Sequence, residues 1–190
     1  MKIYDLPDEV REIVLDRYRF INVEDIEWWE YSLDEIKEIG KILGIDAKNI
    51  YFSGFSSQGD GACFEGDYEY GKQACEKLRK FGRTDAELVR IARDLQKLQS
   101  KYFYQLSAIV THRFHHYHEN SVIIDVEINS DFSNEVTDEA EDGIEELLKD
   151  FMRWIYKELQ DEYESLTSDE YVTETLELNE YSFTSEGEDM

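Results

Sequence analysis

The segment from Phe52 to Gly66 combines residue types that are typical of a binding loop, and it contains four glycines: Gly54, Gly59, Gly61 and Gly66. Glycines spaced this closely permit positive backbone φ angles and the close approach of a ligand or another backbone. A nucleophile elbow is excluded because Gln58 stands where that motif needs a glycine, and a phosphate-binding loop because the segment lacks lysine. The segment is either a structural glycine-rich hairpin or a loop that presents polar side chains to a partner. Those side chains are Ser56, Ser57, Gln58 and Asp60.

All four histidines of the chain are close together, at positions His112, His115, His116 and His118. If this segment is a strand, His112, His116 and His118 share one face, and three imidazoles so arranged can bind zinc or a similar metal. Neither a cysteine nor a catalytic glutamate completes a zinc-enzyme motif around them, so no metal ligand is assigned. A partner-facing patch, a pH-sensitive patch and ordinary surface histidines remain as alternatives.

Carboxylates recur along the segment from Asp131 to Glu164, most of which has the periodicity of a long helix. Residues four apart on a helix are about 6 Å apart along its axis, similar to the phosphate spacing of one nucleic-acid strand. One row on this helix can therefore imitate a nucleic-acid backbone. Its members are Asp138, Asp142, Glu145 and Glu146. A solvated acidic face is the other interpretation, and no carboxylate pair is singled out for acid–base catalysis.

The acidic residues are unevenly distributed along the chain, whose formal net charge is −25 at pH 7. Through Ile128 there are 24 acidic and 17 basic residues, whereas from Asn129 to Met190 there are 21 acidic residues against Lys149, Arg153 and Lys157. Proteins that bind nucleic acids or anionic lipids need clustered Lys and Arg, so the imbalance disfavours both as partners. It indicates a surface for a basic protein partner, with solubility as the alternative explanation.

Apolar periodicity and capping residues predict the helices of the chain. The expected helices span about residues 7–18, 23–43, 70–81, 84–101 and 137–166, with a short one after Thr167 or Ser168. Gly44 suits the left-handed end of the second helix, Thr84 the N-cap of the fourth and Thr137 that of the fifth. The expected apolar face of the first helix consists of Val10, Ile13, Val14 and Tyr18.

Alternating bulky and β-branched residues predict the strands. Two strands are expected between residues 49 and 68, joined by a loop over 56–60, and a hairpin over 102–118 and 121–128. Residues 181–183 are expected to add a last strand. The sequence thus predicts an α+β fold: an antiparallel meander of about four strands packed with amphipathic helices, ending in a long acidic C-terminal helix. No repeat or linker divides it, so residues 1–190 are expected to form a single domain.

The composition predicts a folded chain outside the membrane. Of 190 residues, 41% are hydrophobic and 14% aromatic, and a chain of this length can bury roughly 70% of its unfolded surface. No apolar run approaches the roughly 18 residues of a membrane span, and the N-terminus lacks a signal-peptide pattern. Two cysteines, Cys63 and Cys75, are too few for a disulfide scaffold, which predicts reduced thiols and a cytoplasmic location.

Four segments carry a resemblance to a known family. They are the segment from Ile50 to Gly66, the pattern around His112 to His118, the run from Asp150 to Tyr156 and the run from Leu166 to Glu170. Together they resemble small proteins encoded by bacteriophages and other mobile elements, often labelled as an antitoxin of a toxin–antitoxin stability system. The resemblance covers most of the chain after about Trp28 and implies an antitoxin-like interaction protein, but it supplies no catalytic or binding residue.

Three hypotheses follow. The first is an acidic, non-enzymatic, antitoxin-like inhibitor that binds a basic surface of a host defence protein, nuclease or toxin by DNA mimicry, using the glycine loop and the acidic row. The second is a metal-dependent or nucleotide-handling enzyme that uses the His112–His118 strand and Asp60. The third is a structural or regulatory phage protein that self-associates. The first expects no cofactor, direct nucleic-acid contact or membrane contact, and places the protein in the host cytoplasm.

Overall fold

The computed structural model describes residues 1–24, 27–113, 115–129 and 136–190, and it confirms an α+β fold with an antiparallel four-stranded sheet. The chain divides into two compact units, which we treat separately. The central unit is Leu33–Glu158, and the terminal unit consists of Met1–Ser32 together with Leu159–Met190. The expectation of a single domain over residues 1–190 stays a prediction.

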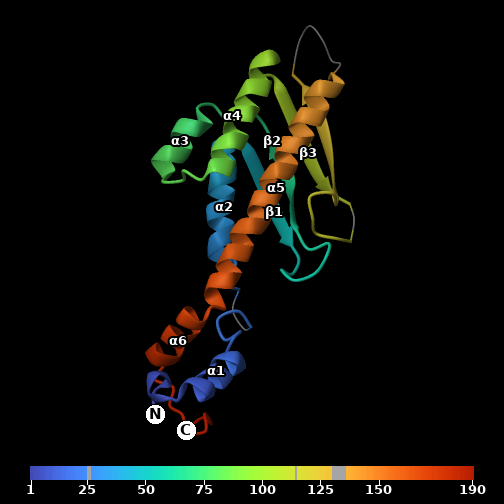
Figure 1. Cartoon of the computed structure of the whole chain (residues 1–190). Helices are drawn as coiled ribbons and strands as arrows, with labels where there is room; N and C mark the ends of the chain where they lie inside the picture. Colours follow the sequence, from blue (N-terminus) through green and yellow to red (C-terminus); the bar gives the residue numbers. More distant parts are fainter. Residues whose placement is uncertain (25–26, 114, 130–135) are drawn as a thin grey trace. The chain divides into compact units, whose positions relative to one another are not determined.

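The sheet of the central unit is a simple meander. Its strands are β1 (Ile45–Phe52), β2 (Ala62–Tyr68), β3 (Leu106–His112) and β4 (Val122–Ile128), in the order β1-β2-β3-β4 (Figure 1). Each strand is antiparallel to its neighbour. The β1–β2 and β3–β4 loops therefore leave the sheet at the same end.

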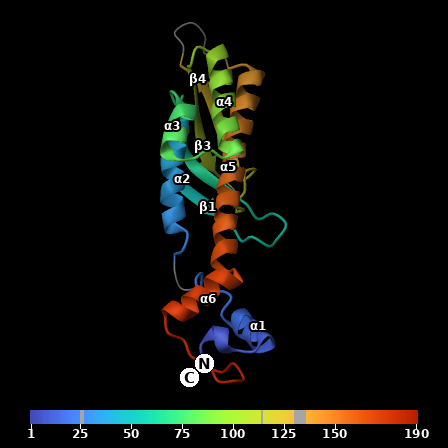
Figure 2. The ribbon, with the colours of Figure 1, turned by 60° about the vertical axis from the view of Figure 1, so that its left-hand side comes forward.

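Helices pack on one face of this sheet. The helices are α2 (Glu30–Leu43), α3 (Ala74–Phe81), α4 (Ala86–Lys101) and α5 (Asp138–Leu166), and α4 and α5 lie side by side over the strands (Figures 1 and 2). The ring of Phe151 on α5 meets that of Phe64 on β2 at 6.1 Å between centroids. A Cβ added at Gly143 of α5 would lie 2.8 Å from Leu98 Cδ2 of α4, so this glycine permits the close approach of the two helices.

The terminal unit joins the two ends of the chain around a small core. It contains a 3-10 turn (Ile3–Asp5), α1 (Asp8–Arg17), the end of α5 and α6 (Asp169–Leu178). The buried core consists of Ile3, Leu6, Val14, Leu15, Val172, Leu176 and Phe183. The amino group of Met1 donates to the carbonyl oxygen of Phe183 at 2.6 Å, and the amide of Phe183 donates back at 2.9 Å. None of the described helices is long and apolar enough to cross a membrane.

Several local predictions are confirmed. Gly44 has a φ of 89° at the end of α2, as the left-handed cap requires. Thr137 Oγ1 accepts a hydrogen bond from the amide of Ala140 at 3.3 Å at the start of α5. Ser168 caps α6, because its hydroxyl accepts from the amide of Tyr171 at 3.2 Å. The four-stranded meander and the long C-terminal helix are also present.

Three predictions about the helices are wrong. Asp85 and not Thr84 caps α4, because its Oδ1 accepts from the amide of Leu88 at 2.9 Å. The predicted second helix begins only at Glu30; the described residues just before it form turns, and residues 25 and 26 lie outside the described chain. Ile13 is 57% exposed, since the buried face of α1 runs through Val14 and Leu15.

Two predicted strands also need correction. β3 does not reach from residue 102 to 118, since Phe103 and Tyr104 have positive φ angles of 54° and 61° and the strand ends at His112. Positive φ is incompatible with extended backbone, and it delays the start of the strand. In place of a strand over 181–183 there is only an isolated bridge between Phe183 and Asp189.

Candidate partner-binding site

The β1–β2 and β3–β4 loops meet at the end of the sheet and form a pocket of about 350 Å³. Its lining residues are Ser53, Gln58, Gly59, Asp60, His115, His116, Tyr117 and His118. Two of the predicted partner-binding residues, Gln58 and Asp60, therefore lie beside three of the four histidines. Ser56 and Ser57 are exposed in the same loop but do not line the pocket.

Asp60 organises the glycine loop. Its Oδ2 atom accepts hydrogen bonds from the backbone amides of Ser56 at 3.0 Å and Ser57 at 2.7 Å. The ends of the loop are closed by Ser53, whose amide donates to the carbonyl of Gly61 at 3.0 Å and whose hydroxyl accepts from the amide of Gly61 at 3.0 Å. The other carboxylate oxygen of Asp60, Oδ1, accepts no hydrogen bond from the described part of the chain. It is therefore available to a ligand.

Helix α5 holds both loops. The hydroxyl of Tyr156 donates to the carbonyl of Gly54 at 3.2 Å, and the Tyr156 ring packs on Phe55 at 5.5 Å between centroids. Arg153, one turn earlier, lies 3.6 Å from Glu119 in the β3–β4 loop. The two loops are thus anchored to the same helix.

Gly61 fixes the contact between the loops. A Cβ at this position would lie 2.6 Å from the Cβ of His118 and 3.0 Å from its Cα, closer than side chains approach one another. No Cβ can be accommodated unless the β3–β4 loop moves. Gly61 therefore allows the backbones of the β1–β2 and β3–β4 loops to come into close contact.

The histidines do not share a strand face, because β3 ends at His112 and the other three lie in the loop that follows. His112 Nε2 donates to the carbonyl of His116 at 3.0 Å, and His118 Nδ1 accepts from the amide of Asn120 at 3.1 Å. The His116 and His118 rings stack at 6.2 Å between centroids. In the described ranges, no group of three or more His, Cys, Asp or Glu side chains is placed to hold a metal ion.

An aromatic cluster lies beside the pocket. The rings of Tyr51, His112 and Tyr117 contact one another at centroid distances of 5.1 to 5.5 Å. The Tyr51 hydroxyl donates to Glu65 Oε2 at 2.9 Å, and this bond and one from Asn49 lower the pKa of Glu65. Our sequence reasoning missed this cluster. The predicted meander could have indicated it, because an antiparallel meander places the β1–β2 and β3–β4 loops at the same end of the sheet.

Cys63 is not a nucleophile of this site. Its side chain is fully buried in β2, and that burial raises the pKa of its thiol to about 12. The thiol is therefore neutral at physiological pH. Cys63 and Cys75 form no disulfide with each other or with another described residue.

The predicted acidic row on α5 is interrupted by basic side chains. Glu145 pairs with Lys149, and Glu146 pairs with Arg153. Asp138 and Asp142 are exposed and form no ion pair with the described residues. Only half of the row therefore presents free carboxylates, which weakens its likeness to a phosphate backbone.

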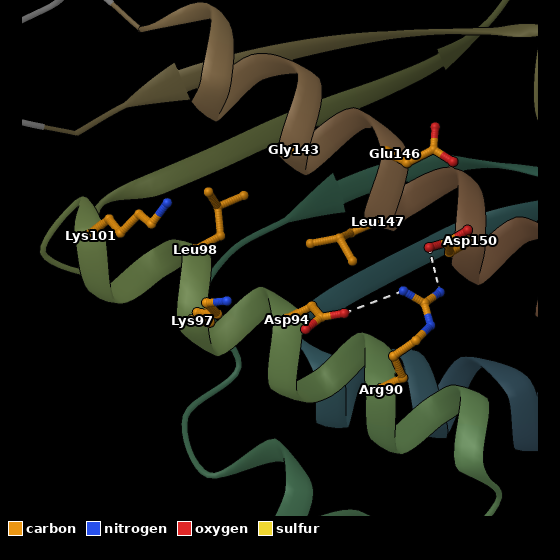
Figure 3. Close-up of a pocket in the computed structure, with 9 residues that line it drawn as sticks. All are labelled: Arg90, Asp94, Lys97, Leu98, Lys101, Gly143, Glu146, Leu147 and Asp150. Atoms are coloured by element: carbon orange, nitrogen blue, oxygen red, sulfur yellow. Dashed lines mark hydrogen bonds and ion pairs between the residues drawn. The ribbon is translucent and has the colours of Figure 1, made fainter.

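The basic face of α4 is directed toward α5. In the groove between the two helices, Arg90 contacts Asp94 at 3.3 Å and Asp150 at 2.5 Å (Figure 3). Lys97 and Lys101 line the same groove together with Leu98 and Leu147, and Lys101 also pairs with Glu139. Arg90 and Lys101 of α4 thus neutralise part of the charge on α5.

The terminal unit has too few basic residues for such neutralisation. Its sequence contains 20 acidic and four basic residues. The three arginines form ion pairs inside the unit: Arg11 with Asp8, Arg17 with Glu188 and Asp189, and Arg19 with Asp16 and Asp169. On α6, Glu170, Glu174 and Leu178 follow one another at four-residue spacing and are exposed, so they share a solvent-facing side of the helix.

Comparison with known proteins identifies a family and no described activity. No curated protein and no solved structure matches the chain. A family described as a domain of unknown function (DUF8835) matches residues 28–169, which include both loops of the pocket and the whole of α5. The chain belongs to this family.

Proposed function

We propose that the protein is a non-enzymatic, antitoxin-like inhibitor that binds a basic surface of a protein partner through the terminal unit. The partner class is a host defence protein, a nuclease or a toxin, and the setting is the cytoplasm of a cell that carries a phage or mobile element. The observation that carries the proposal is the charge of the terminal unit, whose 20 acidic residues face only four basic ones.

Internal ion pairs do not cancel this charge. All three arginines of the unit are already paired with carboxylates of the unit itself, and the remaining carboxylates outnumber them several-fold. A concentrated negative surface attracts a basic partner over about 10 Å at moderate ionic strength and speeds encounter. The terminal unit supplies that long-range attraction.

Exposed apolar side chains supply short-range contacts in the same unit. Tyr31 is 83% exposed and Leu178 is 75% exposed, and Tyr4 and Tyr171 are also exposed. Interfaces obtain most of their binding energy from a few such anchors surrounded by polar residues. The terminal unit therefore combines acidic side chains with aromatic and aliphatic anchors, and this combination suits binding to a basic protein surface.

The acidic row on α5 has a smaller role in the proposal. Two of its four members, Asp138 and Asp142, have carboxylates free of ion pairs with the described residues, so mimicry of a phosphate row is limited to this pair. The glycine loop supplies specificity through Ser56, Ser57 and Gln58, whose side chains are exposed.

Two matched double variants test the proposal. Glu170→Gln with Glu174→Gln removes two exposed carboxylates four residues apart on α6, and Asp138→Asn with Asp142→Asn does the same on α5. A basic partner is first captured from host lysate at low salt and then purified for direct binding measurements. The α6 variant is expected to weaken binding by roughly three- to tenfold, mainly through the association rate, and the α5 variant by less than about twofold.

The salt dependence completes the test. Wild-type binding should fall steeply between about 0.05 and 0.5 M NaCl, and the α6 variant should show a shallower slope because it presents fewer charges. If no basic protein is captured from host lysate even at the lowest salt concentration, the proposal is wrong. If the α5 variant weakens partner binding more than the α6 variant does, the binding surface is the acidic row on α5 and not the terminal unit.

A further inference from the structure

We propose that the pocket between the β1–β2 and β3–β4 loops receives the guanidinium group of an arginine side chain from the partner. The inference rests on the proposed function, because it names the side chain by which a basic partner is recognised. Guanidinium is a flat cation that combines charge, hydrogen-bond donors and two stackable faces. The pocket offers a counterpart to each of these properties.

The charge in the pocket comes from Asp60. Two backbone amides hold its Oδ2 atom, at 2.7 and 3.0 Å, so the carboxylate is oriented before any ligand arrives. Oδ1 takes no hydrogen bond from the described residues and can accept from a guanidinium N–H. The described lining residues include neither lysine nor arginine, so neither of these side chains occupies the pocket beside Asp60. Charge-assisted hydrogen bonds of this kind are about twice as strong as neutral ones.

The walls of the pocket are flat rings. Tyr117 lines the pocket, and its ring is supported by Tyr51 at 5.5 Å and by His112 at 5.4 Å between centroids. His116 and His118 line it as a second stacked pair. Arginine stacks on aromatic faces, whereas the compact ammonium of lysine gains less from a flat wall. The geometry therefore favours arginine over lysine.

Hydrogen-bond acceptors complete the pocket. Ser53, Gln58 and Gly59 also line the pocket, and these residues contain neutral hydroxyl, amide and carbonyl oxygens. A guanidinium carries five N–H donors, so one carboxylate oxygen leaves donors to be satisfied by neutral oxygens such as these. A phosphate finds no such match, since Asp60 repels it and the described lining residues contain no Lys or Arg to bind it.

Three small probes test this pocket with the full-length protein. They are N-acetyl-arginine amide, its lysine analogue and its citrulline analogue, which keeps the shape of arginine but is neutral. Titrations followed by two-dimensional NMR are expected to shift the backbone amides of Gln58, Gly59, His116 and Tyr117. Arginine should bind at least about tenfold more tightly than citrulline and several-fold more tightly than lysine.

Two matched variants locate the effect. Asp60→Asn keeps an oxygen that accepts from Ser56 and Ser57 but removes the charge, and it should weaken arginine binding about fivefold or more. Glu69→Gln removes a carboxylate from a different pocket, lined by Tyr70 and Tyr104, and should leave binding within twofold. Tyr117→Leu should reduce the preference for arginine over lysine and leaves Asp60 intact.

Each outcome decides between the two proposals. Equal binding of arginine and citrulline, or equal binding by wild type and Asp60→Asn, overturns the arginine pocket. Shifts that appear at Glu69 and Tyr70 but not in the two loops also overturn it. If the arginine pocket fails while the α6 double variant still weakens partner binding, the proposed function stands without it. If free arginine binds as expected but no basic partner is found, the proposed function is lost, and with it the claim that the arginine comes from a partner.

Discussion

The central and terminal units carry their charge in different ways. The central unit contains 25 acidic and 16 basic residues, and its basic side chains join separate elements. Arg83 contacts Glu35 of α2 at 2.9 Å and Glu158 of α5 at 3.0 Å, and Arg90 joins α4 to Asp150. The terminal unit, with 20 acidic and four basic residues, can balance only a small part of its charge internally. Charge in the central unit is mainly structural, whereas the terminal unit presents it to solvent.

The hydrophobic core of the central unit is also larger than that of the terminal unit. The central core packs large side chains between sheet and helices, including Phe64, Tyr68 and Phe151. The terminal core is a small cluster closed by hydrogen bonds between Met1 and Phe183 at the two ends of the chain. The small core of the terminal unit contributes little stability and its carboxylates repel one another, so its free energy of unfolding is expected to be small. The unit with the larger excess of acidic residues is therefore also the unit with the smaller core.

Truncation of one phenylalanine in each core is expected to give the largest effects. Phe151→Ala should lower the free energy of unfolding by about 3–5 kcal/mol, because a fully buried ring between Phe64 and Trp154 is lost. Phe183→Ala should cost a similar amount but expose mainly amides of the terminal unit. Chemical denaturation and hydrogen exchange measure both variants. Loss of amide protection in β1–β4 on Phe183→Ala would show that the two cores do not unfold separately.

The next effect concerns the contact between α4 and α5. Gly143→Ala places a Cβ 2.8 Å from Leu98 Cδ2 and is expected to destabilise the protein by about 1–3 kcal/mol, despite the better helix propensity of alanine. The control is Leu98→Val, which removes bulk from the opposing side chain. The cost of Gly143→Ala should be smaller in the Leu98→Val background. Equal costs in the two backgrounds would show that this contact does not limit the approach of the helices.

Ion pairs from the two units should differ in strength. Arg90→Met removes a contact to Asp150, whose side chain is only 14% exposed, and should cost on the order of 1 kcal/mol. Arg11→Met removes a pair with Asp8, which is 88% exposed, and should change stability by less than about 0.5 kcal/mol. Urea denaturation at low and high salt measures both. A larger loss from Arg11→Met would reverse the assignment of structural charge to the central unit.

Much of the fold follows from local patterns in the sequence. The meander, the glycine that ends α2 and the serine that caps α6 each depend on residues that are close in sequence. The errors have local causes too: Thr84 and Asp85 are adjacent and both suit a helix N-cap, and only the structure shows that Asp85 bonds to Leu88. The alternation of polar and bulky residues continues past His112, so composition alone does not reveal where β3 ends.

The candidate site depends on contacts between distant segments. The meeting of Asp60 with the histidine loop follows from the sheet order, and it can be deduced once the meander is predicted. The pairing of Arg90 with Asp150 depends on how α4 and α5 are rotated against each other, which the sequence does not state. Glu146 and Arg153 lie seven residues apart on α5 itself, so their pairing depends on that helix alone. Because these pairs occupy carboxylates of α5, the net charge of the segment overestimated the free acidic surface of this helix.

The smallest expected effect belongs to the hydrogen bond between Tyr51 and Glu65. Tyr51→Phe should lower stability at pH 7 by roughly 0.5–1.5 kcal/mol, because it removes the largest cause of the lowered pKa of Glu65. A carboxylate with a lowered pKa in the folded state stabilises above its unfolded pKa of about 4.3, and this contribution disappears as pH falls through the folded value. The difference between wild type and variant should therefore shrink below about pH 4. Urea titrations across pH 3–7 measure it, with Tyr4→Phe in the terminal unit as the exposed control. A difference that stays constant with pH would show that Tyr51 acts through ring packing on His112 and Tyr117 and not through the charge of Glu65.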